Sequence, residues 1–307
     1  MKKETLNVTA TNERVLNVYA YHPEGTSKGI VHILHGMGEH AGRYDRFAKY
    51  LADQGLTVYA QDHRNHGKSV SDSEHVGIFD KQESFETMVD DVSKVQEYIR
   101  KHESDKPMTI LGHSMGSALL RRFLEKTDKA PEKAIIMGTM PRYNILSGGV
   151  LYILASVSGL FYKKTSRNRF VNFLLNKSMT GKIPNEGSDL DWLSYDESNI
   201  QAYHDDPLSG FVYNKYFYNS FFKSLITLNK ASEISKTPAV KTLFISGHDD
   251  PLSKNMRAIN KLVHSYEKYV DGFDAEIKPI YKARHEVLKE ANYEYTYEYL
   301  LDWILNK

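Results

Sequence analysis

The 307-residue sequence contains no cysteine. This absence excludes a disulfide framework, a thiolate metal site and a cysteine nucleophile, and it fits a protein of a reducing compartment. An excess of charge of either sign is also lacking, because 40 Lys and Arg residues face 39 Asp and Glu residues and leave a formal net charge of +1. Without a global field to gather polyanions, we expect no nucleic-acid partner.

Long apolar runs are absent as well. The longest uncharged segment, residues 143–162, contains polar residues and glycines, so it is a poor candidate for a membrane-spanning helix. The first residues alternate between polar and apolar types and lack the apolar stretch and cleavage site of a signal peptide. We therefore expect a cytoplasmic protein.

The pattern of apolar residues predicts a mostly parallel sheet. Residues 6–11 and 15–22 alternate around a polar turn, which predicts an antiparallel hairpin. Short apolar runs follow, as expected for strands buried on both faces of a sheet, and predicted helices over residues 44–54 and 84–102 separate most of them. These runs are residues 30–34, 56–60, 108–111 and 134–137. The alternation predicts the α/β class, with helices flanking a central sheet.

This rhythm breaks after Met137. The next buried strand is predicted at residues 240–245, about 100 residues later, whereas a simple βαβ unit needs only ~30. The pattern then resumes with a helix over 254–270, a strand over 275–281 and a helix over 288–305. We therefore predict a core formed by residues 1–139 and 236–307, with residues 140–235 as an insertion.

A candidate nucleophile lies in Gly112-His113-Ser114-Met115-Gly116, which matches the Gly-x-Ser-x-Gly nucleophile elbow. A predicted strand ends just before this pentapeptide and a predicted helix over residues 118–124 follows it, as the motif requires. The serine Oγ projects from the strained turn, and flanking glycines let neighbouring backbone approach closely. We predict Ser114 as a nucleophile.

A serine nucleophile also needs donors for the oxyanion that develops on its substrate. The segment His35-Gly36-Met37-Gly38 follows the first predicted parallel strand, where the fold of the elbow motif supplies a backbone donor. We predict that the backbone N–H groups of Met37 and Met115 form the oxyanion hole.

The base and the orienting acid are expected at other strand ends. Asp249 and Asp250 both follow the predicted strand at 240–245 and both are candidates for the acid, because an Asp in a turn can also bond the loop backbone. Of the 13 histidines, only His285 follows the last predicted strand, which gives the chain order Ser, Asp, His. We predict His285 as the base.

His63 and His66, which lie close together in the segment 62–67, could suggest a metal site. No HExxH motif or matching carboxylate spacing accompanies them. We therefore expect no metal site, and the predicted chemistry needs no cofactor.

Five motifs occur in order along the chain. They are residues 35–44 (HGMGEHAGRY), 62–69 (DHRNHGKS), 112–116 (GHSMG), 206–208 (DPL) and 247–252 (GHDDPL). Over nearly its whole length the sequence resembles the monoacylglycerol lipase and lysophospholipase group of α/β-hydrolases, which is serine aminopeptidase S33-like. It departs from the family pattern at Asn65, where glycine is usual, and Asn is the next residue most tolerant of left-handed backbone.

The resemblance implies an α/β-hydrolase fold with a mainly helical cap formed by the insertion. It also implies Asp250 as the acid, three residues after Gly247, and His285 as the base. The implied activity is hydrolysis of acyl esters, such as monoacylglycerols or lysophospholipids, through an acyl-enzyme. A short-chain esterase or an aminopeptidase on the same fold, or a non-catalytic binding protein, is the alternative.

The insertion suits an apolar substrate. Apolar segments at residues 150–154 and 160–162, and many aromatic residues between 211 and 222, offer surface for an acyl chain. Four basic residues follow the second segment, namely Lys163, Lys164, Arg167 and Arg169. The simpler interpretation of these is a solvated charged face, and the alternative is peripheral contact of the cap with an anionic membrane.

Overall fold

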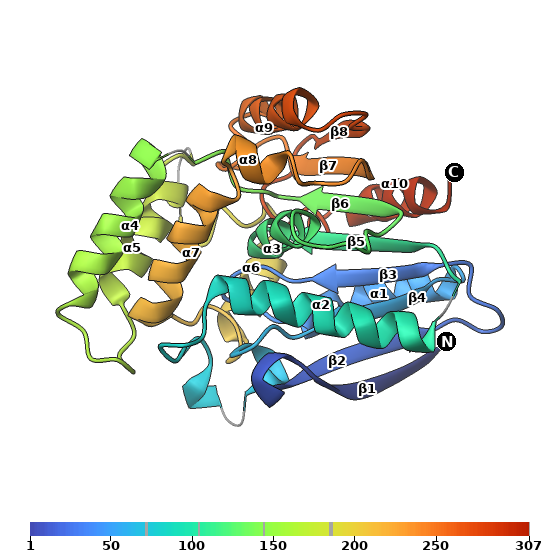
Figure 1. The fold of residues 1–307 in the computed structure, drawn as a ribbon, viewed down its shortest axis with the longest axis horizontal. Coiled ribbons are helices and arrows are strands. Elements are labelled where there is room, and N and C mark those ends of the chain that lie inside the picture. The colour runs from blue at the N-terminus through green and yellow to red at the C-terminus, as the bar shows by residue number, and fades with distance from the viewer. Residues whose placement is uncertain (71–72, 104, 144, 184–186, 307) are drawn as a thin grey trace.

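The computed structural model describes residues 1–70, 73–103, 105–143, 145–183 and 187–306. Short runs rich in Val, Ile and Leu form one eight-stranded sheet with the order β1-β2-β4-β3-β5-β6-β7-β8 (Figure 1). Its strands are β1 Lys2–Thr9, β2 Val15–His22, β3 Ile30–Leu34, β4 Thr57–Gln61, β5 Met108–His113, β6 Lys133–Met137, β7 Lys241–Gly247 and β8 Ala275–Ile280.

The strand pairing confirms the predicted hairpin and the predicted parallel strands. Strand β2 pairs antiparallel with β1 and with β4, whereas all pairs among β3 to β8 are parallel. Every residue of β3 and of β4 is buried, which is why these segments read as continuous apolar runs rather than as alternating ones. A parallel sheet brings the carboxyl ends of its strands to one edge, and the loops with the predicted site residues begin there.

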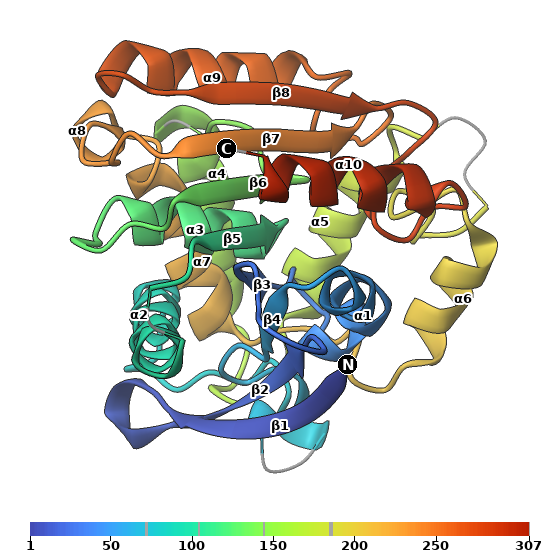
Figure 2. The same cartoon turned by 90° about the vertical axis from the view of Figure 1, so that its right-hand side faces the viewer.

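Helices cover both faces of the sheet (Figure 2). On one face, α1 (Asp45–Asp53) and α10 (Tyr293–Leu305) pack through an apolar cluster that includes Phe47 and Trp303. On the other face, α2 (Phe85–His102), α3 (Met115–Leu124) and α9 (Arg257–Tyr269) pack through a second cluster. The sheet is therefore the middle layer of three.

Residues 140–235, called the insertion below, lie between β6 and β7, and their described residues form helices. They are α4 Ile145–Gly159, α5 Arg169–Thr180, α6 Glu197–Asp205, α7 Lys215–Thr227 and α8 Ala231–Ile234. Figure 1 shows α4, α5 and α7 beyond the arrowheads of the parallel strands. Among the helices in the described residues, none combines the length and hydrophobicity that crossing a bilayer requires. Short 3₁₀ helices occupy Thr11–Glu13, Ala41–Tyr44, Gly67–Ser69 and Ser73–His75.

Three helix starts, those of α3, α9 and α10, differ from the sequence-based prediction by three residues or more. Helix α9 begins at Arg257 rather than at residue 254. Helix α3 begins at Met115 rather than at residue 118, because the elbow turns directly into the helix. Helix α10 begins at Tyr293 rather than at residue 288. Residues 288–292 are not helical, and the Glu290 carboxylate among them accepts the backbone N–H groups of Arg284 and Tyr195. These contacts with distant chain favour a turn over a further helical turn.

Candidate active site

Ser114 lies at the turn between β5 and α3. Its backbone has φ 52° and ψ −115°, a conformation that a residue with a Cβ atom rarely adopts. The turn is held in place because the Ser114 N–H donates to the Met137 carbonyl at 2.9 Å and the Ser117 hydroxyl donates to the Ser114 carbonyl at 2.5 Å. Strained backbone of this kind persists only where surrounding contacts fix it.

The two glycines of the elbow are required by close backbone contacts. A Cβ atom on Gly112 would lie 2.3 Å from the Gly116 carbonyl oxygen, and one on Gly116 would lie 2.1 Å from the Leu34 carbonyl oxygen. Both distances are far below van der Waals contact, so a larger residue would force the strands and helix apart. The steric role predicted for these glycines is confirmed.

Asp250 and His285 meet beside this turn. His285 Nδ1 lies 2.9 Å from Asp250 Oδ2, and both side chains are almost fully buried. The other Asp250 oxygen accepts the Leu252 backbone N–H at 2.8 Å. Asp249 instead accepts a hydrogen bond from the Tyr195 hydroxyl at 3.1 Å. Of the two candidate acids, the structure brings Asp250 to the histidine.

The His285 side chain has a raised pKa, and its Nε2 atom forms no hydrogen bond with the described residues. Burial alone would lower the pKa of His285, but the charge and hydrogen bond of Asp250, together with Glu286 and Glu39, outweigh burial and raise it above 6.5. Within the described residues, His285 Nε2 has no hydrogen-bond partner. The imidazole is therefore oriented from one side, and its second nitrogen is available for proton transfer.

Ser114 and His285 border the same cavity. Gly36, Met37 and Trp192 also line it. Gly138, next to the residue that holds the Ser114 N–H, lies against His285, since a Cβ atom on Gly138 would be 3.2 Å from His285 Cε1. The predicted nucleophile and the predicted base thus open onto one space.

The residues of the two predicted oxyanion donors lie beside Ser114. Met115 is the first residue of α3, so its N–H belongs to the group of helix N-terminal donors that lack an acceptor within the helix. Met37 follows β3 and lines a second cavity together with Ser114 and Met115. The loop after β3 is shaped by Glu39, whose Oε1 accepts the Gly36 N–H at 2.7 Å.

Two cavities share Met37, Ser114, Asn176 and Trp192 as lining residues. The one that includes His285 and the charged Glu39 and Glu286 is called the polar branch below, and the other is called the apolar branch. The apolar branch is lined mainly by the insertion and is built from Met115, Met140, Tyr143, Leu175, Met179, Phe221, Phe222, Leu225 and Leu252. Glu39, Tyr203 and Glu286 line the polar branch. Trp192 lines both branches, and its ring packs on His285 with 4.8 Å between ring centroids.

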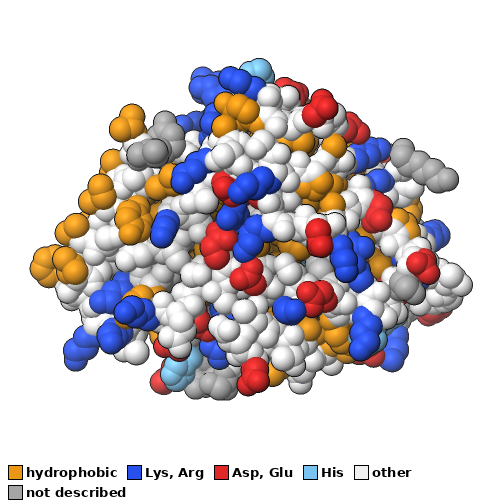
Figure 3. Space-filling view, in the orientation of Figure 1, with side chains coloured by type: hydrophobic (Ala, Val, Ile, Leu, Met, Phe, Trp, Pro, Cys, Tyr) orange, Lys and Arg blue, Asp and Glu red, His pale blue; other side chains and the backbone are white. Residues whose placement is uncertain are grey.

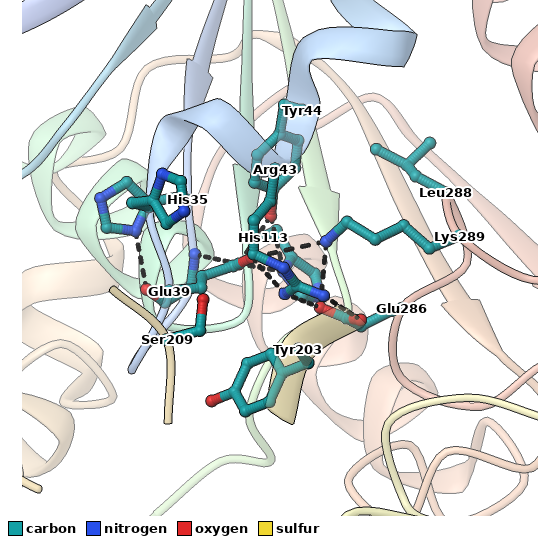
Figure 4. Close-up of polar contacts among 12 residues, drawn as sticks. His35, Glu39, Arg43, Tyr44, His113, Tyr203, Ser209, Glu286, Leu288 and Lys289 are labelled. Atoms are coloured by element: carbon teal, nitrogen blue, oxygen red, sulfur yellow. Dashed lines mark hydrogen bonds and ion pairs between the residues drawn. The ribbon is translucent and has the colours of Figure 1, made fainter. Parts of the chain in front are cut away.

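A buried cluster of charges lies beside the polar branch (Figure 4). Arg43 forms two bonds to Glu286, at 2.5 and 2.9 Å, and one to Glu39 at 2.8 Å, while Lys289 contacts both carboxylates. Burial would raise the pKa of each carboxyl group, but Arg43 and Lys289 outweigh burial and hold the pKa of both Glu39 and Glu286 low. The cluster joins the loop after β3 to the loop that carries His285.

Sequence reasoning missed this cluster. The Glu39–Arg43 pair has i,i+4 spacing and is a usable local signal. Glu286 lies 243 positions from Arg43, so no local spacing indicates their contact. His63 and His66 also have partners within the protein, because His63 Nε2 contacts the His35 carbonyl and His66 Nδ1 contacts the Arg64 carbonyl. Burial lowers the pKa of His63 to about 3 and that of His66 to about 4, so both rings are neutral.

A mostly parallel sheet with a strained serine at the turn from its central strand into a helix defines an α/β-hydrolase. The family model described as serine aminopeptidase, S33 matches residues 25–292. The chain belongs to this family.

The chain is also similar in sequence to known relatives, and it shares its fold with solved structures. The chain is 32% identical to mouse monoglyceride lipase over 189 residues, which is 61% of this chain but only 54% of that enzyme. It is 25% identical to the monoacylglycerol lipase of Mycolicibacterium smegmatis over 288 residues, covering 92% and 90% of the two chains. A carboxyl esterase from Bacillus coagulans in complex with glycerol shares the fold, with a TM-score of 0.87, 22% identity and coverage of 99% and 98%.

Proposed function

We propose that this chain is a serine carboxylic-ester hydrolase that cleaves acyl esters with an apolar chain, such as monoacylglycerols or lysophospholipids. The observation that carries the proposal is the buried pair of His285 and Asp250. It orients a His285 Nε2 that has no partner among the described residues, beside a cavity that Ser114 also lines. The names of the mouse and mycobacterial relatives support the same substrate class.

The proposed reaction proceeds in two steps. Ser114 Oγ attacks the ester carbonyl carbon while its proton passes to His285 Nε2, and Asp250 stabilises the imidazolium that forms. The backbone N–H groups of Met37 and Met115 bind the oxyanion of the tetrahedral intermediate. Collapse of this intermediate expels the alcohol, which takes the proton from Nε2. Water, deprotonated by His285, then attacks the acyl-enzyme and releases the acid.

The insertion, residues 140–235, acts in this proposal as a cap on a core formed by residues 1–139 and 236–307. Leu175 of α5 and Phe222 of α7 supply much of the wall of the apolar branch. The acyl chain occupies this branch, and the alcohol faces the polar branch with its buried carboxylates.

We expect kcat/KM to rise with acyl-chain length from acetate to about decanoate. Each buried methylene contributes ~0.8 kcal/mol, which corresponds to about a two- to fourfold gain. The Leu175→Asn variant should lose most of this gain, because it places an amide in the apolar branch. Ser178→Asn, an exposed position on the same helix, serves as the matched control. The measurement is a series of nitrophenyl esters and monoacylglycerols.

The same series separates the alternatives. A short-chain esterase would be fastest on acetate and show no dependence on position 175. An aminopeptidase would cleave aminoacyl amides faster than any ester. A non-catalytic binding protein would turn over none of these compounds, and any of these three results would contradict the proposal.

A second proposal concerns an exposed apolar patch on the insertion, consisting of Leu146, Val150, Ile153, Val157, Leu160 and Phe161. Figure 3 shows apolar side chains gathered at the left edge of the molecule, over the helices of the insertion. Leu160 and Phe161 are 79% and 85% exposed. The exposed Lys163 and Lys164 follow directly in the chain. This combination favours contact with an anionic lipid surface.

The patch predicts binding to vesicles that contain anionic lipid. Replacing both Leu160 and Phe161 by Asp should weaken co-sedimentation with phosphatidylcholine–phosphatidylglycerol vesicles by at least about tenfold, because two apolar side chains no longer insert. Leu305→Asp, an exposed residue of α10, is the control. Equal binding by the double variant and the control would show that the patch is only a solvated surface.

A further inference from the structure

Both backbone groups of Gly38, the residue after the predicted oxyanion donor Met37, are bound by the insertion. The Gly38 N–H donates to the Tyr213 hydroxyl at 2.7 Å. The Gly38 carbonyl accepts the Tyr203 hydroxyl at 2.9 Å and the Gly210 N–H at 2.8 Å. The partners lie 165 to 175 positions later in the chain, and they hold the backbone that directly follows Met37.

The donor and the acceptor in each hydrogen bond of the Tyr213 hydroxyl can be assigned from its partners, His66 and Gly38. A carbonyl oxygen only accepts, so His66 Nδ1, which lies 2.7 Å from the Arg64 carbonyl, carries a proton. Burial lowers the pKa of His66 to about 4, so the ring is neutral and its Nε2 is bare. Tyr213 therefore donates its hydroxyl proton to Nε2, at 2.6 Å, and its oxygen accepts the N–H of Gly38.

The hydroxyl of Tyr213 has little freedom to move. The residue is 1% exposed, and its ring stacks on Phe217 with centroids 3.7 Å apart and an interplanar angle of 16°. Phe211 packs on another part of the ring at 5.0 Å. The acceptor for the Gly38 N–H is therefore held by an aromatic stack of the insertion and by a buried histidine of the core.

We propose that Tyr213 is a positioning residue that fixes the oxyanion loop through its bond to the Gly38 N–H. This inference rests on the proposed ester hydrolysis, in which the Met37 N–H binds the developing oxyanion. Holding the peptide after Met37 restricts the backbone rotation that would turn this donor away. A misplacement of about 1 Å in such a site can cost about 10²-fold in rate.

The Tyr213→Phe variant tests the proposal. The phenyl ring preserves the stack, but the Gly38 N–H loses its acceptor in a buried place. We expect kcat to fall about 10- to 100-fold, with KM changed by less than about threefold, because the lost interaction acts in the transition state. A decyl trifluoromethyl ketone, whose hemiketal carries an oxyanion, should bind more weakly by a similar factor.

Two further variants separate positioning from a general loss of stability. Tyr203→Phe removes only one of the two donors to the Gly38 carbonyl, so we expect a smaller loss, within about threefold. Tyr266→Phe removes a buried hydroxyl that accepts a hydrogen bond from Arg121 Nε. Neither residue lines the two branches of the site, so kcat should be unchanged. Equal losses in Tyr203→Phe and Tyr213→Phe would contradict a specific role for the N–H contact.

Amide hydrogen exchange supplies a readout that does not depend on activity. The Gly38 amide should exchange slowly in the wild-type protein and faster in Tyr213→Phe. The proposal would be overturned if the Tyr213→Phe variant kept the kcat and the exchange rate of the wild type, or if only its KM changed. Fast exchange of the Gly38 amide in the wild type would also overturn it. Failure of the wild type to hydrolyse esters would overturn the proposed function instead, and the exchange result would still report on Tyr213.

Discussion

Replacing Ser114 by Ala is expected to lower ester hydrolysis by about 10⁴- to 10⁶-fold. The variant keeps the cavity and the oxyanion donors but has no atom that can form the acyl-enzyme. The residual rate comes from binding and oxyanion stabilisation alone. The fold should persist, because Ala and Ser carry the same Cβ atom into the strained turn and the turn is held by backbone contacts. The measurement is kcat/KM for nitrophenyl decanoate, with the thermal unfolding midpoint as the check on folding.

A contaminating esterase is the main alternative source of residual activity. Its contribution is identified by purifying the wild type and the variant in parallel and comparing the activity in each chromatographic fraction. A folded Ser114→Ala protein that retains more than about 10% of wild-type activity, eluting with the protein itself, would mean that another residue is the nucleophile.

Replacing Asp250 by Asn should lower kcat by about 10⁴-fold. The amide offers an N–H toward His285 Nδ1, which favours the tautomer with its proton on Nε2 and leaves that nitrogen unable to accept the Ser114 proton. The imidazolium also loses the carboxylate that stabilises it. Asp249→Asn is the matched control, because Asp249 is the neighbouring residue in the same loop and contacts Tyr195 and His248 rather than His285.

The pH dependence gives the same prediction a second readout. The base must be deprotonated, so activity should rise with pH through the pKa of His285, which the Asp250 carboxylate raises above 6.5. Removing this negative charge lowers that pKa, so the acid limb of the kcat/KM profile should move to lower pH in Asp250→Asn and stay in place in Asp249→Asn. A loss of rate without this shift, or an equal loss in both variants, would contradict the role of Asp250.

The central strands and the elbow could be predicted because their signals are local. A strand buried on both faces needs a short apolar run, and β3 and β5 have one. The steric demand on Gly112 and Gly116 is likewise contained within a strand, a turn and a helix. The start of α10 could not be predicted in this way, because the carboxylate of Glu290 bonds Tyr195, which lies 95 positions earlier.

Around the predicted triad, too, features with a local sequence signal could be predicted and contacts between distant residues could not. The order Ser114, then Asp249 or Asp250, then His285 follows from the positions of strand ends, which the sequence pattern indicates, whereas the choice of Asp250 came from the family resemblance. The ion pair of Arg43 with Glu286 spans 243 positions, and the bond of Tyr213 to Gly38 spans 175. Neither pair has a local spacing rule, so only the folded chain brings these partners together.

Labelling by a fluorophosphonate that carries a decyl chain tests the central proposal most directly, because the probe reacts far faster with a serine that an oriented base activates than with other side chains. Intact-protein mass spectrometry should show one phosphonyl group on each wild-type chain, and peptide mapping should place it on Ser114. Labelling should become slower as the pH falls below the pKa of His285. A folded wild-type protein that takes up no label, or that carries it on any other residue, would contradict the proposal.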